Sequence, residues 1–183
     1  MKATEILSSE HRVIERVISA LENGASQLEK GQPISADFFL KSTDFIKGFA
    51  DGCHHRKEEG VLFKTLVDHG MSYQNGPVAV MLFDHEEGRK FTRGLRQAAQ
   101  ALADGDAQAA SAVITNARGY GQLLRQHIYK EDRILFPAAD QFIPLNEQDA
   151  LLDGFELVEH EETGEGVHEK YLALAEWLEQ QVR

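Results

Sequence analysis

Two stretches of the chain, 54–63 and 127–136, repeat one pattern of residues. The first reads HHRKEEGVLF and the second reads HIYKEDRILF. Each has a His four residues before a Glu and then closes with Leu-Phe. The two pairs are His54 with Glu58 and His127 with Glu131. Residues four apart lie on one face of an α-helix, so each stretch presents an imidazole and a carboxylate together. We therefore expect two helices that carry these pairs on their inward faces.

Apolar residues recur at spacings of three and four over most of the chain, which is typical of amphipathic helices. The first predicted helix ends before Gly31, and the second runs from Ser35 to about Gly70. The third runs from Pro77 to about Leu102, and the fourth from about Asp106 to Ala139. Short turns join them, so the sequence predicts an all-α, antiparallel up-down-up-down four-helix bundle over about residues 3–140. A further helical segment is expected over about 146–183, broken near Gly164 and Gly166. Its last part, through Tyr171, Leu174 and Trp177, is expected to pack outside the bundle. Together these form a single domain, 1–183.

The composition narrows the class of protein. The net charge of −11 argues against nucleic acid and anionic membranes as partners. No apolar run approaches the roughly 20 residues of a membrane span. The N-terminus lacks the pattern of a signal peptide. A single cysteine, Cys53, excludes an internal disulfide framework and a thiolate zinc site. We expect a cytoplasmic protein, either a monomer or a weak homodimer.

Each of the four predicted bundle helices carries a His in its apolar stripe. These residues are His11, His54, His85 and His127. Because neighbouring helices run in opposite directions, all four fall toward the same end of the bundle. Two buried Glu residues in that layer would cost several kcal/mol each without a compensating charge. A pair of metal ions would supply it, with Glu58 and Glu131 as the natural bridges. Imidazole and carboxylate without thiolate suit iron or manganese, with zinc as the alternative.

Four segments give the chain a resemblance to the haemerythrin-like, or HHE cation-binding, family. They are residues 10–15, 53–63, 84–89 and 127–137. The resemblance implies a non-haem di-iron site with two iron ions per chain, joined by oxo, hydroxo or carboxylate bridges. It also implies chemistry of dioxygen, nitric oxide, peroxide or iron itself. Carried over by position, His11 and His54 would hold one iron and His85 and His127 the other, with Glu58 and Glu131 bridging.

One position departs from the family pattern. Oxygen-carrying haemerythrins have a second His four residues after the ligand of the third helix, where this chain has Arg89. His55 is the first candidate for the seventh ligand, Glu86 is the second, and solvent is the third. The alternative for His55 is a residue at the rim, paired with Glu59. A changed ligand set would alter redox potential and oxygen affinity, which argues against simple reversible oxygen carriage.

The leading functional hypothesis is a protein that binds dioxygen, nitric oxide or peroxide at this centre. The alternatives are a di-iron enzyme with oxidase or catalase/peroxidase-like activity, and an iron buffer or sensor. No catalytic residue is assigned, although Tyr120 could serve an enzyme as a proton donor. Glu15 is either an outer hydrogen-bond partner of a ligand or an exposed charge. The run 159–162 is expected to be a solvated face, and His168 a surface residue with the option of folding back onto the bundle.

Overall fold

The computed structural model describes residues 2–162 and 167–183, which form helices and turns without a β-strand. The bundle consists of four helical rods. The first is α1 (Ala3–Glu29), and the second joins α2 (Ala36–Phe45), η1 (Ile46–His55), η2 (Glu58–Leu62) and α3 (Phe63–Asp68). The third is α4 (Pro77–Ala103), and the fourth joins α5 (Ala109–Lys130), η3 (Glu131–Leu135) and α6 (Phe136–Phe142). The chain continues through a short 3-10 turn, η4 (Leu145–Glu147), into α7 (Gln148–Glu162) and α8 (Val167–Gln181).

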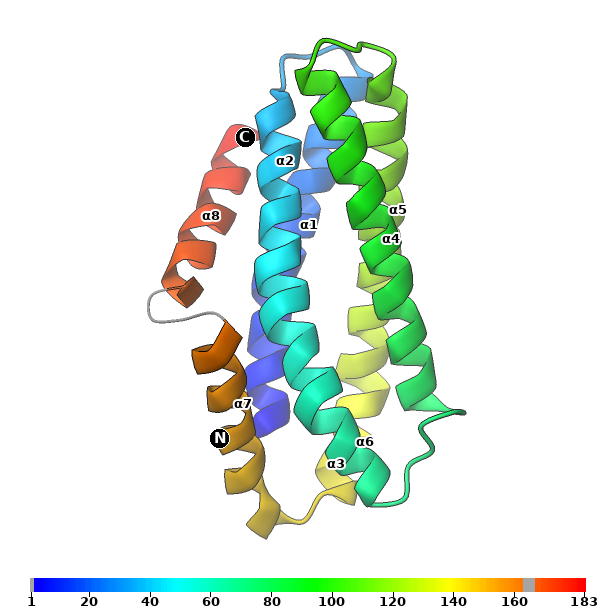
Figure 1. Ribbon diagram of the computed structural model, residues 1–183, viewed down its shortest axis with the longest axis vertical. Helices are drawn as coiled ribbons and strands as arrows, with labels where there is room; N and C mark the ends of the chain where they lie inside the picture. The colour runs from blue at the N-terminus through cyan, green and yellow to red at the C-terminus, as the bar shows by residue number, and fades with distance from the viewer. Residues whose placement is uncertain (1, 163–166) are drawn as a thin grey trace.

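The four rods run alternately up and down, as the sequence predicted (Figure 1). Ser35 caps α2 by accepting a hydrogen bond from the Phe38 N–H, and Pro77 lies in the first turn of α4. The fourth rod begins at Ala109, three residues later than predicted, because the Asp106 carboxylate accepts from the Gln108 N–H in a separate turn. It also ends later than predicted, at Phe142.

Three parts of the bundle, η1, η2 and η3, are π-helical, which the periodicity did not predict. A π turn is wider than an α turn, so consecutive side chains differ less in direction around the axis. Each of these segments contains or borders residues of the His-Glu repeats. The π geometry therefore changes which side chains of the repeats face the interior.

The buried apolar residues form two clusters, with a polar layer between them. One cluster includes Leu7, Leu62, Met81 and Leu135, and the other includes Ile14, Phe49, Leu95 and Leu124. Along each rod, the His and Glu residues of the repeats lie between the residues of the two clusters. Apolar side chains above and below the layer thus keep bulk water from it.

Helices α7 and α8 pack outside the bundle, which was predicted for α8 (Figure 1). Helix α8 packs against α1 and α2, and α7 packs against α1, η1 and η2. Gly48 allows the close approach of α8, because a Cβ at this position would lie 1.6 Å from the Tyr171 hydroxyl. The predicted break near Gly164 and Gly166 lies outside the described residues. No described helix combines the length and the apolar character needed to span a membrane.

Candidate metal centre

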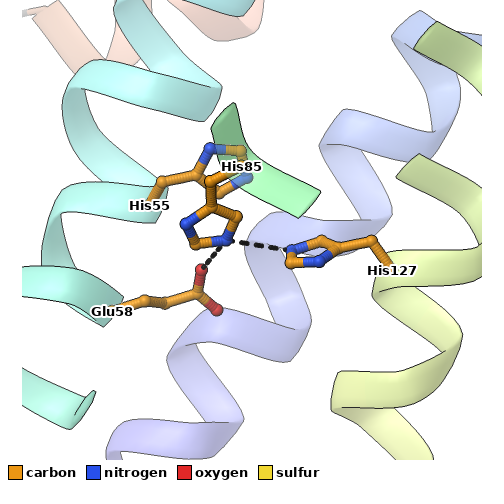
Figure 2. A group of neighbouring side chains, drawn as sticks. All are labelled: His55, Glu58, His85 and His127. Carbon is orange, nitrogen blue, oxygen red and sulfur yellow. Dashed lines mark hydrogen bonds and ion pairs between the residues drawn. The ribbon is translucent and has the colours of Figure 1, made fainter. Parts of the chain in front are cut away.

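The structure brings all seven predicted site residues into the polar layer, in two groups that share Glu58. The α1 group is His11, His54, Glu58 and Glu131, and the α4 group is His55, Glu58, His85 and His127. In each group, the atoms that could bind a metal lie within 4.8 Å of one another. Figure 2 shows the α4 group, whose side chains come from three rods and point toward one another. Every one of the seven side chains is buried.

Glu58 and Glu131 lie between the two groups. The Glu58 Oε1 atom is 3.5 Å from His54 Nε2, and its Oε2 atom is 3.4 Å from His85 Nε2. The Glu131 Oε2 atom is 3.2 Å from both His11 Nε2 and His127 Nε2. Each carboxylate therefore faces imidazoles of both groups, which is the position a bridging ligand needs.

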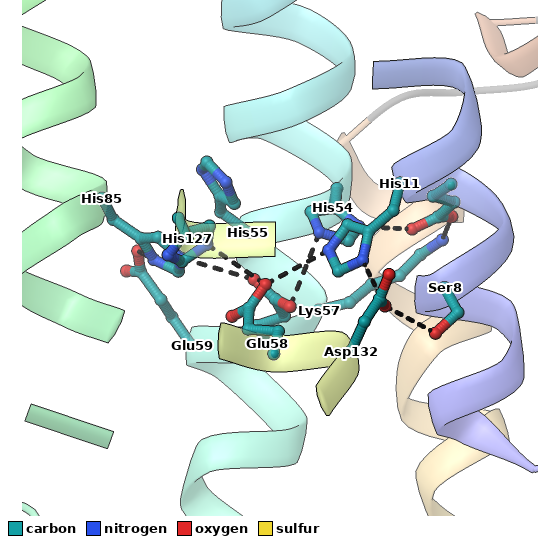
Figure 3. A network of polar contacts seen from close by, with 12 residues as sticks. Ser8, His11, His54, His55, Lys57, Glu58, Glu59, His85, His127 and Asp132 are labelled. Carbon is teal, nitrogen blue, oxygen red and sulfur yellow. Dashed lines mark hydrogen bonds and ion pairs between the residues drawn. The ribbon is translucent and has the colours of Figure 1, made fainter. Parts of the chain in front are cut away.

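The outer nitrogen of each imidazole faces a carboxylate. The Nδ1 pairs are His11 with Asp132 at 2.9 Å, His54 with Glu10 at 2.9 Å, His55 with Asp51 at 2.9 Å, His85 with Glu59 at 2.7 Å, and His127 with Asp84 at 3.4 Å. Figure 3 shows part of this network, including His11 beside Asp132 and His85 beside Glu59. An Nδ1–H that donates to a carboxylate leaves the Nε2 lone pair free to bind a metal. Four of the imidazoles are thus oriented with Nε2 toward the layer by a hydrogen bond at Nδ1, whereas His127 Nδ1 faces Asp84 without one.

His54 and His55 are consecutive, yet both are buried and belong to different groups. They lie at the end of the π-helical segment η1, whose wide turns bring neighbouring side chains to one side. The His55 ring stacks on the His85 ring, with centroids 3.9 Å apart and an interplanar angle of 17°. The π segment therefore accounts for a fifth imidazole in the layer.

The buried polar atoms test whether metal ions fit the layer. The Nε2 atoms of His11, His54 and His55 and all four carboxylate oxygens of Glu58 and Glu131 lack a hydrogen-bond partner among the described residues. His85 Nε2 lies 3.1 Å from His127 Nε2. Without a metal, one of these two nitrogens donates a hydrogen bond to the other. Unpaired buried polar atoms cost about 1–3 kcal/mol each, and cations would satisfy all of them at once. The donor set therefore fits a pair of cations.

The electrostatics of the site agree with this conclusion. Burial lowers the pKa of His54 to about 4 and lowers the pKa of His85 well below its ordinary value, so both are neutral imidazoles at neutral pH. Burial together with the neighbouring Glu131 raises the pKa of Glu58 well above its ordinary value. Burial opposes protonation of His127, but the Glu131 charge raises its pKa to about 9. A cation bound here would have to displace protons from Glu58 and His127.

The geometry separates the two side chains that are candidates for the seventh ligand. His55 belongs to the α4 group, whereas the Glu86 side chain is half exposed and pairs with Arg93 at 3.0 Å. The expected alternative partner of His55, Glu59, instead contacts His85 and the Arg89 Nη2 atom, the latter at 2.7 Å. His55 therefore lies in the layer and not at its rim.

The sequence reading missed the outer carboxylates. Glu15, which was considered for this role, pairs with Arg12 at 2.9 Å. Glu10 and Asp84 directly precede His11 and His85, but each serves an imidazole of a different rod. Only the pairing of Asp51 with His55 could have been predicted from the sequence, because Asp51 lies four residues before His55 on the same helix face.

A second polar cluster lies beside the α1 group. The buried Lys57 ammonium contacts the carboxylates of Glu10 and Glu159, so Glu159 forms an ion pair with the bundle while 42% of its side chain stays exposed. His160 is exposed, as predicted, and the side chains of Glu161 and Glu162 lie outside the described residues. Glu10, Cys53 and Glu159 have the spacing of a cation site, but the Lys57 ammonium already supplies the positive charge there. Burial raises the pKa of the Cys53 thiol to about 11.

The rings of His168 and Tyr120 were also considered from the sequence. The His168 ring packs against Phe49, with centroids 5.5 Å apart, so it folds back onto the bundle. The Tyr120 hydroxyl is buried and has no hydrogen-bond partner among the described residues. Burial raises its pKa well above the ordinary value, so the phenol stays protonated.

Comparison with known proteins agrees with the geometry. The family model described as hemerythrin HHE cation binding domain matches residues 2–139. Uncharacterized proteins of Mycobacterium tuberculosis and Mycobacterium bovis are each 26% identical to the chain over 163 residues, which is 89% of this chain and 63% of theirs. The chain thus spans less than two thirds of the length of these relatives. No solved structure gives a significant match. The match over residues 2–139 includes all seven buried site residues, and the chain belongs to the hemerythrin HHE cation-binding domain family.

Proposed function

We propose that the chain is a non-haem di-iron protein that binds dioxygen, nitric oxide or peroxide. The observation that carries this proposal is the set of unpartnered Nε2 and carboxylate atoms that converge in a layer closed by two apolar clusters. In this proposal the α1 group holds one iron and the α4 group the other, with Glu58 and Glu131 as bridges. When bound, an iron pair supplies redox chemistry and open coordination positions for a small ligand.

The protein's own residues would perform three tasks. The imidazoles of His54 and His85 present neutral nitrogens, and carboxylates at Nδ1 hold His11, His54, His55 and His85 in place. The apolar clusters exclude water, which strengthens electrostatic interactions inside the layer. With both carboxylates bridging, the α1 group would offer four protein ligands and the α4 group five, which leaves room for an external ligand, since iron takes up to about six.

Metal analysis together with an absorption spectrum of the purified protein tests the proposal. We expect two irons per chain and a spectrum that changes when azide or nitric oxide is added. A matched pair of variants, Glu58→Ala and His160→Ala, separates ligands from surface residues. Glu58→Ala should lose metal and His160→Ala should keep it. Two irons per chain in Glu58→Ala would contradict the bridging assignment.

A di-iron oxidase or catalase-like enzyme is the second candidate, and Tyr120 is the observation that favours it. A buried phenol without a partner is a proton donor that turnover could use. Oxygen evolution from peroxide distinguishes the two functions. Rapid evolution that Tyr120→Phe reduces by tenfold or more would favour the enzyme, whereas binding spectra without turnover favour the binding protein.

A further inference from the structure

A surface pocket of about 530 Å³ lies between the second rod and α4, next to the α4 group. This volume is within the range of small-molecule sites, roughly 300–1,000 Å³. Five of its nine lining side chains are basic. They are Lys47, Arg56, Arg89, Arg93 and Arg96. The chain as a whole carries 19 basic and 30 acidic residues, so this concentration of positive charge runs against its overall composition.

The arginines have donors for a further anion. Arg89, Arg93 and Arg96 are four and three residues apart on α4, so they lie along one face of that helix. Arg93 pairs with Glu86, and Arg96 pairs with Asp44, in contacts that are about half exposed. Exposed pairs of this kind contribute little, about 0–1 kcal/mol, and a guanidinium has five N–H donors. Among the described residues, Lys47 makes no ion pair.

The type of side chain indicates the type of ligand. Planar guanidinium groups match the oxygen atoms of phosphate in paired hydrogen bonds. The pocket is larger than inorganic phosphate requires, and Asp51 is the single acidic residue in its lining. We propose that this pocket binds a phosphate-bearing small molecule of nucleotide size.

The pocket also touches the metal centre, through two of its lining residues. Asp51 accepts the hydrogen bond of His55 Nδ1 at 2.9 Å. The Arg89 Nη2 atom lies 2.7 Å from Glu59, the outer partner of His85. The Arg89 Nε atom also lies 3.6 Å from Asp51. A phosphate held by Arg89 competes with both carboxylates for the guanidinium, so its binding alters the surroundings of His55 and His85. This last step rests on the proposed function.

Calorimetric titration of the purified full-length chain with ADP, adenosine and citrate tests the pocket. We expect ADP to bind, adenosine not to bind, and citrate to bind more weakly than ADP. Arg93→Glu and Arg96→Glu should each weaken ADP binding by tenfold or more. The matched control is Arg118→Glu, which makes the same charge change at an exposed arginine paired with Glu29, and which should change Kd by less than twofold.

Three outcomes would overturn the proposal. They are the absence of ADP binding at millimolar concentration, tighter binding of citrate than of ADP, and equal weakening by Arg118→Glu. The link to the metal centre has its own readout, the absorption spectrum of the iron-loaded protein at saturating ADP. We expect a shift that Arg93→Glu abolishes while iron content stays unchanged, and an unchanged wild-type spectrum would overturn the link through Arg89. Because iron content is measured in every sample, a failure of the di-iron proposal is seen separately.

Discussion

The α1 group and the α4 group offer the same kinds of ligand but differ in how they are closed off from solvent. Behind the α1 group, Glu10 is buried and contacts Lys57, which is buried completely and reaches Glu159 of α7. Behind the α4 group, the outer carboxylates Asp51 and Glu59 have side chains that are 18% and 30% exposed. On its His54 side the α1 group is covered by an added helix, whereas Asp132 beside His11 is 22% exposed. On its His55 and His85 side the α4 group is separated from the surface pocket by one layer of side chains, whereas Asp84 beside His127 is 8% exposed.

This difference assigns different tasks to the two positions. We expect the ion pairs of Lys57 behind His54 to slow the exchange of a metal held by the α1 group. The α4 group borders solvent through Asp51 and Arg89, so external ligands and protons reach it more easily. The following predictions test this contrast, beginning with the residue that belongs to both groups.

Glu58→Gln is expected to have the largest effect, because Glu58 is shared by both groups. The amide keeps the volume but cannot bridge two cations, so we expect the iron content to fall from two per chain to below 0.2, or roughly tenfold. Elemental analysis after desalting measures this. The control is Glu15→Gln, which changes a partly exposed carboxylate paired with Arg12. Retention of two irons in Glu58→Gln would remove the basis for a shared bridge.

The same substitution has the opposite effect on the metal-free protein. The folded-state pKa of Glu58 is raised, so the unfolded chain releases this proton at lower pH than the folded chain does. The metal-free wild type therefore loses stability as pH rises above the ordinary Glu pKa, by about 1.4 kcal/mol per pH unit until the folded pKa is reached. Denaturant unfolding in chelator from pH 5 to 8 should show this loss in the wild type and a smaller one in Glu58→Gln. Equal slopes would mean that Glu58 is not the buried acid responsible.

His55→Ala separates the two groups, since it removes a nitrogen from the α4 group alone. We expect the iron content to fall from two per chain to one, with the α1 group still loaded. His54→Ala, the neighbouring residue, should produce the complementary loss, and the two singly loaded proteins should differ in spectrum. Full iron content in His55→Ala would reject the fifth imidazole as a ligand.

Lys57→Met tests the seal behind the α1 group. Removing one partner of a buried ion pair leaves Glu10 without its cation, at a cost of about 3–5 kcal/mol in the free energy of unfolding. Denaturant unfolding of the metal-free protein measures this cost. Lys90→Met is the matched control, because Lys90 pairs with Glu87 on the surface, and we expect about 0.5 kcal/mol or less. A similar small loss in Lys57→Met would show that the buried pair is not what holds α7.

The sequence predicted the residues of the layer but not their surroundings. The sequence predicted that His11, His54, His85 and His127 lie in one layer of the bundle. Their spacing along each helix and the alternating direction of neighbouring helices are enough for this prediction. The pairing of Glu10 with His54 and of Asp132 with His11 depends on how separate rods rotate against each other. That rotation is set by packing over the whole bundle, and no local pattern encodes it.

The π-helical segments are a second feature that the sequence did not predict. His55 was proposed as a ligand because it adjoins His54 and a family ligand was absent at Arg89, not because its direction could be derived. Its burial follows from the wide turns of η1. The glycines at 48 and 52 tolerate departures from α-helical geometry, but glycine in a helix does not by itself specify a π turn. Lys57 and Glu159 were missed for the same reason as the outer carboxylates, since they meet only when α7 is docked.

The smallest effects are expected for the outer carboxylates, and they sharpen the comparison between the groups. Glu10→Gln and Asp51→Asn each replace a carboxylate with an amide that still accepts a hydrogen bond from an imidazole. Substitutions of such partners weaken metal binding by about 10–100-fold. We expect Glu10→Gln to weaken metal binding by an amount near the upper end of this range, because the Glu10 side chain is buried and also contacts Lys57. We expect Asp51→Asn to weaken it by an amount near the lower end, because the Asp51 carboxylate is partly exposed to water. Competition with a chelator measures both affinities, and the reverse order would contradict the sealed and open character assigned to the two groups.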